Sequence, residues 1–98
     1  MKYVITWETR ANVSEDLQAR VLQVFSKWQP SEAVNYLQFV GRVDWRGGFA
    51  VVETDDPDAL SKDAAIFAPF LDYQIHPVLD IQEAAAHAGE AIEFRSSV

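Results

Sequence analysis

The stretch VNYLQFVGRVDWRGGFAVVET, residues Val34–Thr54, decides the fold because it contains two alternating strands joined by a short turn. The first strand is predicted over Val34–Asp44 and the returning strand over Phe49–Thr54. Between them lies Trp45–Gly48, whose paired glycines supply the positive φ that a tight hairpin requires. The centre of the chain is therefore predicted to be an antiparallel hairpin.

The residues before this hairpin predict one strand and one helix. Lys2–Glu8 alternates between the two faces of a strand, and Arg10–Val13 is a loop. Ser14 is a suitable N-cap for a helix that ends before Pro30. Apolar residues recur along this helix at helical spacing, at Leu17, Val21, Val24, Phe25 and Trp28.

A second helix and a fourth strand follow the hairpin. Asp56 can cap the helix and Pro57 suits its first position, whereas Pro69 stops it. Phe70–Leu79 alternates as a strand, and Pro77 predicts that this strand lies at a sheet edge, because proline cannot donate to a ladder. The apolar stripe of the second helix is Leu60, Ala64 and Phe67.

A third helix is predicted at the end of the chain. Asp80–Glu83 resembles a capping box, with Asp in the place of Ser or Thr. Gly89 weakens the middle of this helix. Its narrow apolar stripe consists of Ile81, Ala84, Ala85, Ala88 and Ile92.

The order βαββαβα predicts one α+β domain over residues 1–98, with a ferredoxin-like four-stranded antiparallel sheet and an extra C-terminal helix. Both main helices should cover one face of the sheet. The other face is too apolar for plain solvent and too polar for a dry core, so we expect a homodimer that pairs two such faces into a dimeric α/β barrel. The residues expected on that face are Val4, Thr6, Tyr36, Gln38, Val40, Arg42, Gln74, His76 and Val78.

Composition excludes several classes of function. A net charge of −7 argues against nucleic-acid binding and against an anionic membrane surface. The chain has no cysteine, which excludes disulfides, zinc–thiolate sites and thiol nucleophiles. No metal site and no cofactor are predicted. The start of the sequence lacks the pattern of a signal peptide, so the expected location is the cytoplasm.

Five segments resemble the family of small bacterial proteins known as domain of unknown function 3303. They are MKYVITW (Met1–Trp7), VFSKW (Val24–Trp28), GGFAVVETD (Gly47–Asp55), PVLDI (Pro77–Ile81) and AIEFR (Ala91–Arg95). The resemblance spans nearly the whole chain. It implies a dimeric α/β barrel and no assigned activity.

Three residues are candidates for catalysis, each with a structural alternative. An imidazole can serve as a base or an acid, so His76 could act as a base beside Gln74, or it could be a surface histidine next to Pro77. Glu53 could be a general base or a structural ion-pair partner. Arg42 could clamp a substrate anion, or it could pair with Glu53 or Asp44 across the hairpin.

Three interpretations remain open at this point: two functions from different classes, and a purely structural role as a dimerising subunit whose sheet face is only an interface. The first is binding of a small apolar or aromatic ligand in the dimer barrel cavity. The second is a cofactor-independent enzyme of the monooxygenase, isomerase or cyclase type, which rests on fold analogy. The residues expected to contact a ligand are Thr6, Tyr36, Gln38, Arg42, Gln74 and His76.

Overall fold

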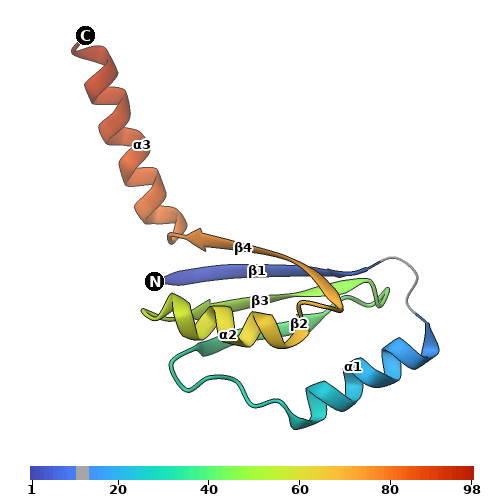
Figure 1. Cartoon of the computed structure of the whole chain (residues 1–98). Helices are drawn as coiled ribbons and strands as arrows, with labels where there is room; N and C mark the ends of the chain where they lie inside the picture. The colour runs from blue at the N-terminus through green and yellow to red at the C-terminus, as the bar shows by residue number, and fades with distance from the viewer. Residues whose placement is uncertain (11–13) are drawn as a thin grey trace.

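Four strands form one antiparallel sheet, and three helices accompany it in the predicted order βαββαβα (Figure 1). The structure is a computed structural model that describes residues 1–10 and 14–98, so most of the predicted loop Arg10–Val13 lies outside the described residues. The elements are β1 (Lys2–Thr9), α1 (Glu15–Lys27), β2 (Asn35–Gly41), β3 (Gly47–Glu53), α2 (Pro57–Phe67), β4 (Leu71–Val78) and α3 (Ile81–Ser96).

The strand order is β2-β3-β1-β4, so β1 and β3 lie in the centre and β2 and β4 at the edges. Every pairing is antiparallel. This order is compatible with the ferredoxin-like arrangement that the sequence predicts. Pro77 lies in the edge strand β4 opposite Tyr3, as expected for a residue without an N–H donor.

Two of the three predicted helix starts are confirmed by their caps. The Ser14 side chain accepts a hydrogen bond from the Leu17 N–H, and the Asp56 side chain accepts one from the Ala59 N–H. Helix α3 begins at Ile81 with Asp80 at its N-cap position, as predicted, but the capping box is wrong, because the Asp80 side chain makes no cap hydrogen bond. The Asp80 carboxylate instead accepts a hydrogen bond from Lys2 Nζ at 2.9 Å, and this bond joins the N-terminal end of α3 to β1.

The two faces of the sheet differ in what covers them. On the covered face, Ile5 pairs with Ala50 and Tyr3 pairs with Val52, and this face meets α2. On the open face, Val4 pairs with Val51 and with His76. The buried core consists of Ile5, Val34, Ala50, Val52, Ala59 and Leu60.

A β-bulge in β2 corrects one prediction about these faces. The register of β2 against β3 shifts between Tyr36 and Gln38, which leaves Leu37 as an extra residue. Tyr36 therefore pairs with Val52 on the covered face, whereas uninterrupted alternation placed it on the open face. Gln38 remains on the open face, opposite Val51.

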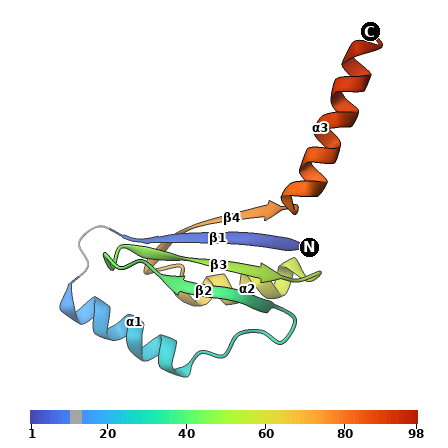
Figure 2. The ribbon, with the colours of Figure 1, turned by 180° about the vertical axis from the view of Figure 1, so that it is seen from behind.

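Helix α3 projects away from the sheet in both views (Figures 1 and 2). It runs through Gly89 without a break, and none of its residues is buried. The radius of gyration is 17.6 Å, whereas a compact chain of this length has roughly 13 Å. The apolar stripe predicted for this helix is consequently exposed, with Ile81 and Ile92 among its members.

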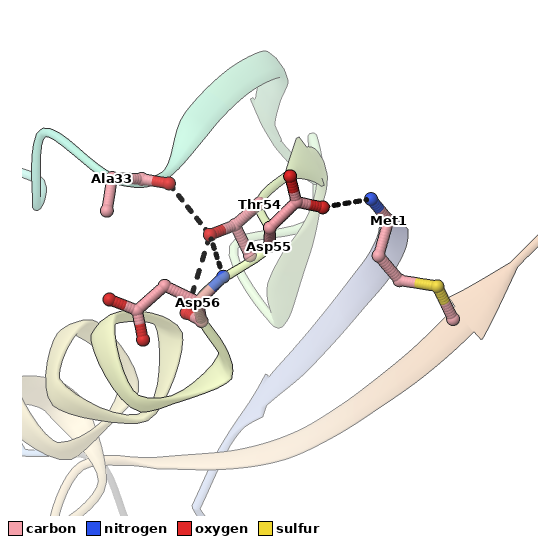
Figure 3. Close-up of polar contacts among 5 residues, drawn as sticks. All are labelled: Met1, Ala33, Thr54, Asp55 and Asp56. Carbon is pink, nitrogen blue, oxygen red and sulfur yellow. Dashed lines mark hydrogen bonds and ion pairs between the residues drawn. The ribbon is translucent and has the colours of Figure 1, made fainter.

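Thr54 fixes the connection between β3 and α2 (Figure 3). Its hydroxyl donates to the Ala33 carbonyl oxygen at 2.7 Å and accepts from the Asp56 N–H at 3.0 Å. Its own N–H donates to the Met1 carbonyl oxygen at 2.9 Å. The Met1 amino group in turn pairs with the Asp55 carboxylate at 3.1 Å. One hydroxyl thus joins the start of α2 to the segment before β2.

Among residues 1–10 and 14–98, no helix has the length and apolar character needed to cross a membrane.

Candidate functional site

A cleft of about 820 Å³ lies between α1, α2 and the covered face of the sheet. Its volume falls within the range of roughly 300–1,000 Å³ that is usual for small-molecule sites. Helix α1 forms one wall of the cleft, because Leu17, Val21, Leu22 and Phe25 line it together with the C-cap residue Trp28. Phe25 of α1 meets both Phe39 of β2 and Phe67 of α2, with ring centroids 6.2 Å apart in each pair, so α1 faces the side of the sheet on which α2 lies. Figure 2 shows α1 standing apart from the strands, beyond β2. The predicted placement of both helices over one face is therefore confirmed.

Helix α1 does not seal this cleft. None of its residues is buried, and the side chains of Leu22 and Phe25 remain 58% and 50% exposed. Phe39, which lines the cleft from β2, is also exposed. Exposed apolar surface of this extent usually marks a binding site or an interface. The cleft is thus a place where a bound molecule would remove apolar surface from water.

Aromatic rings supply most of the cleft wall. Trp28 lies edge-to-face with Phe67, with ring centroids 5.2 Å apart. Tyr36 stacks on Phe39 with ring centroids 5.4 Å apart, and Trp7 lies edge-to-face with Phe39, also at 5.4 Å. Such mutually packed rings hold each other in fixed orientations. All three tryptophans of the chain line the cleft.

One charged side chain belongs to the buried part of this wall. Asp63 of α2 is only 7% exposed. Its carboxylate accepts from the Ser31 N–H at 3.1 and 3.2 Å and from the Tyr36 hydroxyl at 3.1 Å. Burial, followed by the nearby Asp63 charge, raises the pKa of Tyr36. The phenol therefore stays protonated and donates to Asp63.

Trp28 contributes a polar atom that lacks a partner. Its indole Nε1–H is buried and has no hydrogen-bond acceptor among the described residues. An unpaired buried donor of this kind costs roughly 1–3 kcal/mol. This wall of the cleft therefore contains a hydrogen-bond donor, the Trp28 indole N–H, that has no partner among the described residues.

The sheet also forms a second, smaller pocket of about 200 Å³. It brings together Thr6, Arg42 and Gln74, three of the residues that the sequence predicts to contact a ligand, and Phe49 also lines it. Thr6 lies opposite both Gln74 and Phe49 in the sheet. The volume is below the usual range for a site that encloses an organic ligand.

The remaining predicted site residues are dispersed. His76 is exposed on β4, and its Nε2 lies 3.4 Å from Gln74 Oε1, as the sequence suggested. Glu53 lies on β3 opposite Lys2. The guanidinium of Arg42 pairs with Asp44, which is the structural alternative foreseen for it. In the described part of the chain, no hydrogen bond or ion pair joins His76, Glu53 and Arg42 to one another.

Asp63 is the residue that sequence reasoning missed. It lies three residues after Leu60 and four before Phe67, on the buried side of α2, so a carboxylate interrupts an apolar stripe. That interruption was the available signal. Within residues 1–10 and 14–98, no three acidic or histidine side chains gather as metal ligands.

The alkaline stability of the protein is expected to depend on Tyr36 and Tyr73. Burial raises the pKa of both phenols, that of Tyr73 to about 12. Since an unfolded tyrosine titrates near pH 10, their contribution is complete below about pH 10 and is lost as pH rises through the folded values. Titration by phenolate absorbance, with unfolding followed by circular dichroism, should show both phenolates appearing together with unfolding. Loss of a phenolate signal near pH 10 in a folded Tyr73→Phe variant would contradict this.

The profile of the family described as Domain of unknown function (DUF3303) matches residues 1–92 of the chain. No curated protein matches the sequence.

Proposed function

Because this chain belongs to the DUF3303 family, whose description assigns no activity, we propose from its own structure that it binds a small apolar or aromatic molecule in the cleft under α1. The observation that carries the proposal is the size and aromatic lining of this cleft. The location differs from the sequence-based expectation, which put the ligand on the opposite face of the sheet. The volume favours the cleft, because it is about 820 Å³ against about 200 Å³ for the pocket at Thr6 and Gln74.

The energetics of the cleft support an occupant. Transfer of apolar surface out of water contributes about 25 cal/mol per Å², so a molecule seated between α1 and the sheet gains from both walls. Leu22 and Phe25 on α1 and Phe39 on β2 are the exposed side chains that such a molecule would cover. The edge-to-face rings offer a preformed surface for a flat ligand.

A cleft variant with a matched control tests this proposal. Leu22→Arg places a charge at the cleft wall, whereas Gln23→Arg places the same charge on the neighbouring exposed position of α1, which does not line the cleft. The probe is N-phenyl-1-naphthylamine, a neutral dye that fluoresces in apolar sites. We expect Leu22→Arg to weaken its binding about tenfold or more and Gln23→Arg to change it by about twofold or less. Equal affinities for the two variants would reject the site.

We further infer that two copies of the chain associate through their open faces. Val40 on the edge strand β2 and Phe49 opposite it on β3 are 50% and 46% exposed on this face, which also carries Val4 and Val51. Exposed apolar residues surrounded by polar ones are usual at interfaces, and twofold pairing is the commonest assembly. The cleft lies within one chain, so ligand binding does not depend on this association.

The association is tested by measuring mass in solution. In analytical ultracentrifugation, the unmodified chain should have twice the mass of one chain, which is 11.0 kDa. Val40→Glu should shift it to the monomer, because burial of an unpaired carboxylate opposes pairing. Ile66→Glu, which adds the same charge to an exposed apolar position on α2, should leave the dimer intact. A monomeric unmodified chain would refute the inference.

A further inference from the structure

We propose that the ligand of the cleft is an organic cation, an ammonium or amidinium group carried on an apolar or aromatic body. This inference rests on the proposed binding function and names its ligand class. It is carried by the juxtaposition of a wall of aromatic rings and a buried carboxylate, that of Asp63, which has no ion-pair partner among the described residues.

The carboxylate of Asp63 has neutral hydrogen-bond donors and no cation. Its partners are the Ser31 N–H and the Tyr36 hydroxyl, and no ion pair involves it among the described residues. An ionised carboxylate offers about four acceptor positions, so it can accept further hydrogen bonds. Buried charges in proteins are normally paired, because removal of a lone charge from water is costly. A ligand cation would supply the missing countercharge.

The rings near Asp63 suit the same ligand. Phe67 lies one turn along α2 from Asp63, and Tyr36 is hydrogen-bonded to its carboxylate. Trp28 connects these two rings, edge-to-face with Phe67 and 6.0 Å from Tyr36. Aromatic faces attract ammonium and guanidinium groups, most strongly when the cation is desolvated. The carboxylate and the rings thus both favour a positively charged ligand.

The remaining charges do not oppose a cation. Of the described residues that line the cleft, Arg42 is the basic one, and its guanidinium is already paired with Asp44. The whole chain carries 15 acidic against 8 basic residues. Such a net negative charge raises the local concentration of cations and their rate of association. An organic anion would instead have to bind next to the carboxylate of Asp63, which has the same sign of charge.

Three probes of nearly equal size separate charge from apolar contact. They are 1-naphthylmethylammonium, the neutral 1-naphthalenemethanol and the anionic 1-naphthoate, each titrated calorimetrically into the full chain. We expect the ammonium to bind about tenfold tighter than the alcohol and the carboxylate to bind weakest. Equal affinities for ammonium and alcohol would overturn the cation proposal while the binding function stands. Failure of all three probes to bind would reject the binding function itself.

Two variants assign the preference to Asp63. Asp63→Asn removes the charge but keeps an acceptor for Tyr36, so the ratio of ammonium to alcohol affinity should fall to about threefold or less. Tyr36→Phe removes one hydrogen bond but keeps the charge, so the preference should remain. A preference unchanged in Asp63→Asn would overturn the assignment. Should Asp63→Asn fail to fold, the ranking of the three probes on the unmodified chain still decides the ligand charge.

Discussion

A Gly47→Ala variant is expected to lose about 4 kcal/mol or more of its free energy of unfolding. Gly47 has a φ of +156°, which side-chain-bearing residues rarely adopt. A β carbon at this position would overlap the backbone carbonyl of Trp7, which cannot move without breaking the ladder between β1 and β3. Both the dihedral angle and the close approach therefore require glycine here. The measurement is urea unfolding of the variant, followed by circular dichroism.

Gly41→Ala is the matched control for this prediction. Gly41 lies near the same hairpin at the end of β2, but an added β carbon there would meet nothing within 4 Å. The same substitution should thus change stability by about 0.5 kcal/mol or less. Similar unfolding midpoints for Gly41→Ala and Gly47→Ala would show that the turn does not constrain Gly47 in this way.

A Thr54→Val variant is expected to lose roughly 2–4 kcal/mol. Valine has nearly the same shape as threonine but cannot bond to the Ala33 carbonyl or to the Asp56 N–H (Figure 3). Because Thr54 is 6% exposed, water cannot easily replace the lost hydroxyl. The Ala33 carbonyl and the Asp56 N–H, whose bonds to Thr54 are partly buried, would then lose this partner, each at a cost of about 1–3 kcal/mol.

Thr54→Ser separates the hydroxyl from the methyl group. Serine keeps both hydrogen bonds and loses one methyl, a change worth about 0.8 kcal/mol. Urea unfolding should therefore rank the stabilities as threonine, then serine, then valine. A valine variant that is as stable as the serine variant would mean that the Thr54 hydroxyl contributes little.

Local chemistry was sufficient to predict the elements and the connectivity of the fold. The caps at Ser14 and Asp56, the prolines and the alternation of the strands each depend on residues close in sequence. Predictions were wrong where a distant residue intervened. Asp80 pairs with Lys2, 78 positions away, in place of capping α3. In the turn before β3, Trp45 has a φ of 64° alongside Gly47, whereas the paired glycines Gly47 and Gly48 were expected to supply the positive φ.

The site was less predictable, because it depends on how deeply each side chain is buried and on the extra residue of the β-bulge in β2. A single bulge at Leu37 moves Tyr36 to the other face, and no local signal marks it. Asp63 became a candidate site residue only through its hydrogen bonds from Ser31 and Tyr36, which lie about thirty positions away in the chain. Of the Trp, Tyr and Phe residues that line the cleft, Tyr36 was the one predicted to contact a ligand. Their exposure to a cleft follows only from how far α1 stands from the sheet.

The central claim, that the ligand occupies the cleft under α1, is tested most directly by magnetic resonance. Intermolecular Overhauser effects would be recorded between N-phenyl-1-naphthylamine and the methyl groups of the isotope-labelled chain. We predict contacts to Leu17, Leu22 and Leu60, which line the cleft. Contacts to Val4, Val40 and Val51 on the open face, with none to the leucines of the cleft, would contradict the account.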